Sequence, residues 1–138
     1  MSVERRNPEG LHVPPGYHHV TIVDGGGRVA YLAGQCPVAP DGTVVGAADA
    51  DADLDAQVGQ IVTNSLVALR AIDAAPDDVV RSVIYVVTNE TPELGAVWRR
   101  FQRSELAPAF TTASTLLGVA ALGFAGQRVE VDLTVALS

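Results

Sequence analysis

The sequence predicts an α+β domain in which helices cover one face of a mixed sheet. Two stretches repeat apolar residues at helical spacing, and five stretches rich in β-branched residues have the character of strands. Their order along the chain, ββαβαββ, is typical of a sheet with helices on one side. The 138 residues contain no repeat, low-complexity tract or linker, so residues 1–138 are expected to form a single domain.

A β-hairpin is the first predicted unit. The segment GYHHVTIV alternates after Tyr17, the glycine-rich DGGG at 24–27 reverses the chain, and RVAYLAG supplies the second strand. A loop with a tight Asp–Gly turn follows at Asp41 and Gly42.

The first predicted helix comes after the acidic stretch ADADADLD at 48–55, because acidic side chains near a helix N-terminus interact favourably with its dipole. Pro76 is expected to end this helix. The apolar stripe at helical spacing comprises Leu54, Val58, Ile61, Val62, Leu66, Leu69 and Ile72.

The second half alternates strands with one more helix. Residues 79–87, VVRSVIYVV, form a β-branched strand, and Thr91 with Pro92 is predicted to provide the N-cap and first turn of the next helix. The strands ASTLLGV and VEVDLTVAL then complete the chain. The stripe predicted to bury the second helix comprises Leu94, Val97, Trp98 and Phe101.

The run from Leu106 to Gln127 contains no charged residue and is long enough to raise the question of a membrane span. Its composition argues against a helix, because prolines and glycines interrupt it and four hydroxyl residues cluster in TTAST. We therefore expect a buried strand followed by a glycine-rich loop, and no membrane partner.

The strand at 79–87 is apolar on both faces. Val83, Tyr85 and Val87 share one side, and Val80, Ile84 and Val86 share the other. A strand of this kind is buried on both sides, yet two helices cover only one side of a sheet. We expect another copy of the chain to cover the face of the sheet that the helices leave open, which predicts a homo-oligomer.

Composition excludes several classes of function. The net charge of −7 makes nucleic acid an unsuitable partner, since phosphate binding requires a basic face. All nine basic residues are arginines, so Schiff-base lysine chemistry and a Walker-type phosphate loop are excluded. No signal peptide is visible and Cys36 is the single cysteine, which together favour a cytoplasmic location.

Several motifs in order resemble the Rid family, the reactive intermediate deaminases also called the YjgF family. They are GYHHV, YLAGQCPVAPDG, a helix with Gln57 and Asn64 seven residues apart, ASTLLGVAAL and VEVDL, spread over residues 14–137. The resemblance implies a chorismate-mutase-like fold, a homotrimer, and small-molecule clefts between subunits. It also implies hydrolysis of enamines and imines, typically 2-imino acids, to a keto acid and ammonia without metal or organic cofactor.

The resemblance also identifies two departures from the family pattern. Aligned on residues 118–122, the arginine that clamps the substrate carboxylate in the family falls on Ser114, which has one hydroxyl and no charge. A family asparagine three positions before Trp98 falls on Gly95. These replacements predict a changed ligand.

Four other family positions persist. Tyr17 matches the family tyrosine, Gly34 matches a backbone contact, and Leu116 supplies a backbone carbonyl. Glu130 matches the glutamate that positions the hydrolytic water. The alternation of VEVDLTV independently separates Glu130 from the apolar face of its strand, where it serves as a candidate general base or, alternatively, as a solvated carboxylate; Asp132 is interpreted as structural.

Arg128 shares strand parity with Glu130, so it is a candidate replacement for the missing arginine. The alternative interpretation is a surface arginine paired with a carboxylate.

The histidines and the cysteine carry weaker hypotheses. His18 and His19 are adjacent, so in a strand they point to opposite faces and cannot chelate one metal together. No trusted metal spacing includes His12 or Cys36, and no metal site is predicted. His18 is a candidate to line the cleft beside Tyr17, and Cys36 is interpreted as a buried thiol rather than a nucleophile.

Two classes of function therefore remain. One is a cofactor-free deaminase or related hydrolase of enamine- or imine-type substrates with altered specificity. The other is a trimer that keeps the clefts without the chemistry and binds a small metabolite or another protein.

Overall fold

The computed structural model describes residues 2–47 and 53–138. Within them the chain forms six strands, two α-helices and two short 3-10 turns. In chain order these are β1 Ser2–Arg6, β2 Val20–Asp24, β3 Arg28–Tyr31, α1 Leu54–Ala71, η1 Pro76–Asp78, β4 Val79–Val87, α2 Thr91–Gln102, η2 Ala107–Phe110, β5 Ala113–Val119 and β6 Val129–Leu137.

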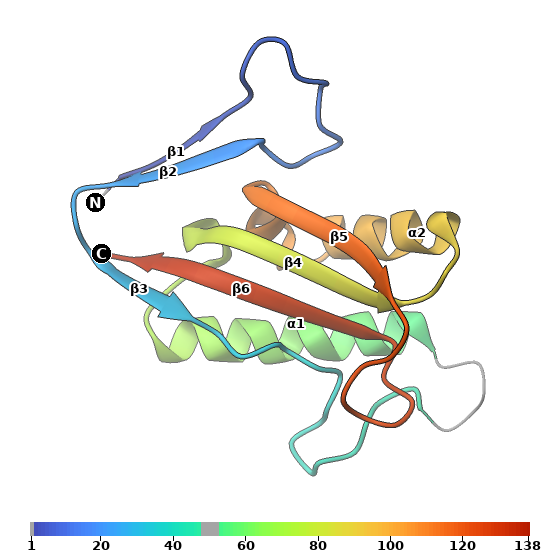
Figure 1. Ribbon diagram of the computed structural model, residues 1–138. Helices are drawn as coiled ribbons and strands as arrows, with labels where there is room; N and C mark the ends of the chain where they lie inside the picture. The colour runs from blue at the N-terminus through green and yellow to red at the C-terminus, as the bar shows by residue number, and fades with distance from the viewer. Residues whose placement is uncertain (1, 48–52) are drawn as a thin grey trace.

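The main sheet has the order β3-β6-β4-β5, with β4 and β5 parallel and the other two pairs antiparallel. Both α-helices lie behind the same face of this sheet (Figure 1). The predicted α+β class, with helices on one face of a mixed sheet, is therefore confirmed. The strands predicted at 79–87, in ASTLLGV and in VEVDLTVAL coincide with β4, β5 and β6.

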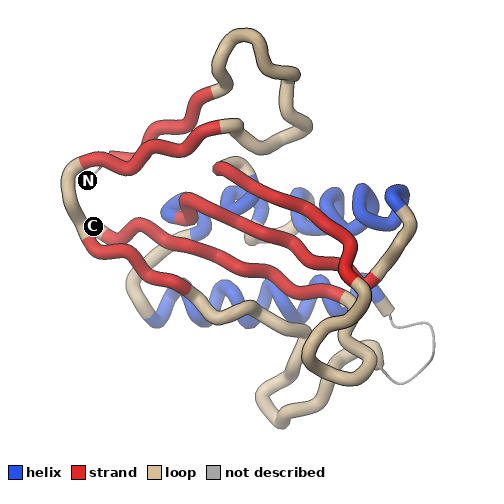
Figure 2. Tube along the Cα trace, in the orientation of Figure 1, coloured by secondary structure: helices blue, strands red, loops and turns tan. Residues whose placement is uncertain are grey.

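The predicted hairpin between β2 and β3 is wrong. β2 pairs instead with β1, the charged SVERR segment that was not predicted as a strand, and β3 pairs with β6. Figure 2 shows β1 and β2 as a separate ribbon above the main sheet. The positive φ angles of Gly25 (95°) and Gly26 (56°) turn the chain from one sheet into the other. Glycine-rich turns reverse a chain without deciding which strand pairs with which.

Helix boundaries differ from the prediction by a few residues. Asp53 caps α1 by accepting hydrogen bonds from the backbone N–H groups of Asp55 and Ala56. The remainder of the predicted acidic lead-in, at 48–52, lies outside the described residues. α1 ends at Ala71, before Pro76, because the chain turns at Asp73, whose φ is 55°.

Pro76 begins η1 instead of ending α1. Thr91 is the first residue of α2, and the N-cap is Glu90, whose side chain makes no capping bond. The predicted cap was therefore one residue late. Pro92 lies in the first turn, as predicted.

The core lies between the main sheet and the two helices. On β6, Val129, Val131, Leu133 and Val135 are all buried, as the alternation predicted. On α2, Val97, Trp98 and Phe101 are buried, and α1 buries Val58, Ile61 and Leu69. The largest side chains that are fully buried here are Phe101, Phe110, Ile61, Leu69, Ile84, Leu106 and Leu133.

The uncharged run at 106–127 forms η2, β5 and the loop that leads to β6. A strand followed by a glycine-containing loop was predicted there. Among the helices of the described residues, none combines the length and apolar character needed to cross a bilayer.

Candidate functional site

Glu130 is the second residue of β6 and lies on the face that the helices leave open. Its neighbours Val129 and Val131 are buried on the helix side, whereas Glu130 and Asp132 point to the other side and are half-buried. Glu130 pairs across the sheet with Tyr85 of β4. The structure therefore places this glutamate on the face opposite the buried valines, as the alternation predicted.

One oxygen of the Glu130 carboxylate accepts two hydrogen bonds. The Cys36 thiol donates to Oε1 over 3.1 Å, and the Gln127 amide donates to the same atom over 3.2 Å. The other oxygen, Oε2, faces Gly34, where an added Cβ would lie only 2.4 Å away. Gly34 and Glu130, two of the residues matched to the family site, thus lie against each other, and the close approach requires glycine at position 34.

Helix α1 holds the two loops that carry these donors. The Gln57 side chain donates to the Gly126 carbonyl (2.9 Å) and accepts from the Arg128 N–H (2.7 Å). Two helical turns later, the Asn64 side chain donates to the carbonyls of Cys36 (3.0 Å) and Val38 (2.9 Å). The two amides that contributed to the resemblance, seven residues apart, therefore anchor both sides of the Glu130 environment.

Cys36 is a protonated thiol at neutral pH. Burial raises its pKa to about 11, and the hydrogen bond to Glu130 and the negative charge of that carboxylate act in the same direction. Nucleophilic cysteines require the opposite shift. The arrangement therefore agrees with the interpretation of Cys36 as a thiol that does not attack substrates.

Asp132 has a separate partner on the open face. The Tyr85 hydroxyl donates to Asp132 Oδ2 over 2.8 Å, and this bond, together with burial, raises the pKa of Tyr85. Because its oxygen is bonded to Tyr85, Asp132 fits a structural role.

Tyr17, Ser114 and Leu116 meet in a second place, a small pocket of about 90 Å³ between α2 and the edge strand β5. Pro15, Trp98 and Thr115 complete its walls. The Trp98 indole N–H donates to the Pro15 carbonyl over 3.1 Å, which fixes the segment that carries Tyr17. This pocket brings together three of the predicted ligand-binding residues.

The Ser114 hydroxyl is already engaged within the chain. It lies 2.6 Å from the Ser82 hydroxyl and donates to the Thr112 carbonyl over 3.0 Å. Ser114 pairs with Ser82, which is fully buried on the helix side of β4. A hydroxyl with these partners offers little to a ligand, and it carries no charge.

The aromatic neighbours of Tyr17 differ from the expectation. His12 Nε2 lies 2.9 Å from the Tyr17 hydroxyl, and the ring of His19 stacks edge-on against both His12 and Tyr17. His18 points elsewhere, with Nδ1 bonded to the Thr111 carbonyl. Of the three histidines, His12 and His19 therefore accompany Tyr17, which strand alternation alone did not indicate.

Arg128 forms an ion pair with Glu93 of α2 and donates through Nε to the Val87 carbonyl over 3.1 Å. This geometry matches the alternative interpretation, a surface arginine paired with a carboxylate. Within a single chain, Arg128 and Glu130 are not brought together by any hydrogen bond or ion pair of the described residues.

The two groups of predicted residues lie on opposite sides of one sheet. Ser114 and Leu116 face the helix side through their partners Ser82 and Ile84, whereas Glu130 faces the open side beside Tyr85. One chain therefore holds the candidate base and the candidate ligand pocket without joining them.

Comparison with known protein families identifies the family to which this chain belongs. The model of the endoribonuclease L-PSP family matches residues 12–137, nearly the whole chain. The chain belongs to this family. The predicted resemblance to Rid proteins is confirmed in the same comparison, because YyfB of Yersinia pestis, described as a conserved Rid-family protein of unknown function, is 30% identical with a TM-score of 0.81. The match covers 99% of this chain and 100% of YyfB.

More distant structures share the fold of this L-PSP family member. Rv2704 of Mycobacterium tuberculosis, a member of the YjgF/YER057c/UK114 family, is 20% identical with a TM-score of 0.60, over 99% of this chain and 100% of its own. The yeast protein YEO7 is 20% identical with a TM-score of 0.65, over 98% of both chains. No curated protein matches the chain.

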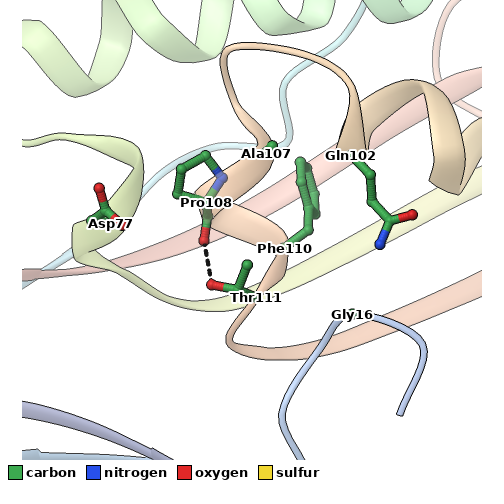
Figure 3. A pocket seen from close by; sticks show the side chains of 7 residues that line it. All are labelled: Gly16, Asp77, Gln102, Ala107, Pro108, Phe110 and Thr111. Carbon is green, nitrogen blue, oxygen red and sulfur yellow. Dashed lines mark hydrogen bonds between the residues drawn. The ribbon is translucent and has the colours of Figure 1, made fainter.

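A larger hollow of about 460 Å³ lies beside η2 (Figure 3). Its walls include Asp77, Gln102 and Thr111, and the Thr111 hydroxyl is turned back to donate to the Pro108 carbonyl over 2.9 Å. Asp77 is the one ionisable residue among the lining residues, so this hollow has no acid–base pair. Across residues 2–47 and 53–138, no three His, Cys, Asp or Glu side chains cluster as a metal site would require.

Proposed function

We propose that this family member is a homotrimer with small-molecule clefts between subunits, and that it hydrolyses enamine- or imine-type substrates without a cofactor and with altered specificity. One observation carries the proposal: Glu130 and the Tyr17–Ser114–Leu116 pocket lie on opposite faces of the same sheet. A second copy laid on the open face would supply the half of the site that each chain lacks. The open face also exposes large apolar side chains, Tyr31 at 81% and Val29 at 48%.

In this proposal Glu130 is the general base. It removes a proton from a water molecule as the water oxygen attacks the imine carbon, and it passes this proton to the nitrogen to give a carbinolamine. The remaining hydroxyl proton is then transferred to the nitrogen as the C–N bond breaks and the C=O bond forms, so that the nitrogen leaves as ammonia. The products are a carbonyl compound and ammonia, so the atoms of imine and water are accounted for. The backbone of Gly34 and the carbonyl of Leu116 are proposed to orient the substrate.

The altered specificity follows from Ser114. Removing one partner of a charge-assisted arginine–carboxylate contact in a desolvated cleft costs about 2–5 kcal/mol. At about 1.4 kcal/mol per tenfold, efficiency towards 2-imino acids should fall by tens- to thousands-fold. The serine hydroxyl cannot compensate, because it is uncharged and already bonded to Ser82 and Thr112. We expect a substrate without a carboxylate at this position.

The test compares the chain with an arginine-bearing relative in a coupled assay for ammonia. Little or no turnover of 2-iminobutanoate or aminoacrylate is expected, with turnover of carboxylate-free imines that Glu130→Gln abolishes. Ser114→Arg is expected to restore part of the imino-acid activity, limited by Gly95 and Leu116. Wild-type turnover of 2-imino acids equal to the relative's would contradict the specificity, because the clamp would then come from elsewhere.

Assembly is tested separately by light scattering at micromolar concentration. Three chain masses are expected. A stable monomer would contradict the shared clefts, whatever the activity assay shows.

Arg128 is proposed, secondarily, to contribute to ligand binding in the assembled trimer, although Glu93 holds it within the chain. Arg128→Ala should then weaken the binding of a ligand identified in the imine screen, whereas Glu93→Gln, which frees the arginine, should not. Unchanged affinity in Arg128→Ala would leave this residue a purely structural role.

A non-catalytic trimer is the second candidate, and the Tyr17 pocket favours it. The walls of that pocket are apolar or carry hydroxyls that are already bonded, so it suits a neutral metabolite better than a reacting ion. Thermal-shift screening of imines and small apolar metabolites distinguishes the two. Stabilisation by a compound that is never turned over would support the binding protein.

A further inference from the structure

We infer that the Cys36 thiol is a positioning group that aims the Glu130 carboxylate, with Gln127 as its counterpart. The inference rests on the proposed role of Glu130 as a base. Its observation is that Cys36 Sγ and Gln127 Nε2 approach the same oxygen, Oε1, at 3.1 and 3.2 Å. Two donors that converge on one carboxylate oxygen define the direction of the whole group.

The second oxygen of the carboxylate, Oε2, accepts no hydrogen bond from the described residues. Oε2 lies over Gly34, where even a methyl group would approach it to 2.4 Å. A quarter-turn of the carboxylate would break both hydrogen bonds, whereas a half-turn only exchanges two equivalent oxygens. The contacts around Glu130 therefore hold its carboxylate in one orientation, which is the property a base acting on a bound water requires.

Further hydrogen bonds hold both donors, Cys36 and Gln127, in position. Gln127 is 4% exposed, and its own amide is fully used: Oε1 accepts from the Phe124 N–H at 3.2 Å and Nε2 also donates to the Val129 carbonyl at 3.0 Å. Cys36 is held through its carbonyl, which accepts from Asn64, and Asn64 is in turn oriented by Gln60 at 2.9 Å. Helix α1 thus sets the position of the thiol.

A thiol keeps its proton in this place. Burial, the bond to Glu130 and the charge of that carboxylate raise the pKa of Cys36 to about 11, so the S–H remains a donor throughout the neutral range. Four other titratable groups share this face: Asp132 adds a small contribution in the same direction, the Tyr85 hydroxyl is bonded to Asp132, and Arg81 and Tyr31 lie opposite Thr134 on the neighbouring strands. Oxidation or alkylation of Cys36 would remove the donor.

The first test measures the contact without any substrate. Thiolate absorbance at 240 nm is followed during a pH titration of the assembled protein. Wild-type Cys36 is expected to titrate with a pKa of about 11, and Glu130→Gln should lower that pKa, because the negative charge that opposes ionisation of the thiol is removed. Asp132→Asn is the matched control and should lower it less. Equal titration in wild type and Glu130→Gln would overturn the inference.

The second test measures positioning. Cys36→Ala removes the donor and Cys36→Ser keeps one. Towards a carboxylate-free imine, kcat should fall about five- to tenfold in Cys36→Ala with KM unchanged, and Cys36→Ser should recover most of the loss. A merely structural cysteine would instead give equal effects in both variants, and that result would overturn the inference.

The two tests separate this inference from the proposed function. If the wild type hydrolyses no imine, the catalytic role of Glu130 fails, and with it the positioning of a base. The titration would still establish whether the thiol is bonded to Glu130. If turnover is present but both Cys36 variants behave as wild type, the proposed function stands and the positioning role is wrong.

Discussion

The two faces of the main sheet are built from the same strands but by different means. The face covered by α1 and α2 is mostly apolar, with the hydrogen-bonded pair of Ser82 and Ser114 as its polar residues on β4 and β5, and Ile84, Val86 and Leu133 are at most 1% exposed there. The open face has carboxylates, a tyrosine and a thiol that bond to one another, and Asn64 of α1 holds the segment that carries the thiol. The covered face supplies most of the buried apolar core of the fold, whereas the open face holds polar groups in fixed positions.

The largest expected effect is a difference in stability between variants of two adjacent residues of β6, one on each face of the sheet. Leu133→Ala should lower the free energy of unfolding by about 2–5 kcal/mol, because it leaves a cavity in the core. Thr134→Ala, on the open side, should change it by less than about 1 kcal/mol. Urea denaturation of both variants measures the difference. Comparable losses would show that the open face also contributes a packed core.

Gly34→Ala tests the open face directly. The new Cβ would clash with Glu130 Oε2 at 2.4 Å, so we expect about 1–3 kcal/mol of destabilisation or a displaced carboxylate. Gly59→Ala on α1 is the matched control, because no atom lies within 4 Å of its added Cβ; it should stabilise the protein by about 0.5–1 kcal/mol. Thermal unfolding compares the two. A neutral Gly34→Ala would show that Glu130 moves away freely.

The Cys36 thiol gives the open face a pH dependence. Its pKa is raised in the folded chain from the ordinary value of 9.0 to about 11. Below the unfolded value both states hold the proton and this stabilisation is fully present. It is lost as the pH rises from about 9 to about 11, because only the unfolded thiol then ionises.

The loss should be on the order of 1 kcal/mol, since solvent screens a partly exposed group. Urea unfolding at pH 8, 9.5 and 11 measures it, and Cys36→Ala should lack this component. An identical pH profile in the variant would place the dependence on other groups, such as Tyr85.

The smallest expected effect concerns the edge between the two faces, where Arg128 meets Glu93. Both side chains are partly exposed, at 24% and 30%, so Glu93→Gln should cost only about 0.5 kcal/mol in dilute buffer. The difference should shrink at 1 M salt, because screening weakens such pairs. A loss that persists at high salt would indicate that packing at this edge, and not charge, is what the variant disturbs.

Much of the fold followed from local patterns. Alternation in VEVDLTVAL predicted which residues of β6 are buried, and helical spacing predicted the buried stripe of α2. These patterns succeed because the period of a side chain's direction is set by the backbone itself, at 2 residues for a strand and 3.6 for a helix. The separation of Glu130 from the core was predictable for the same reason.

Only the tertiary structure decided which elements meet. β2 was expected to pair with β3 and instead pairs with β1, although each strand pattern alone was compatible with either partner. The contacts that define the Glu130 environment join residues far apart in the chain, 94 positions for Cys36 and 71 for the bond between Gln57 and the Arg128 N–H. Local periodicity carries no information about such separations, because they depend on how whole elements pack. The amino-acid sequence alone therefore determined the faces of the strands, and packing determined which groups on those faces touch.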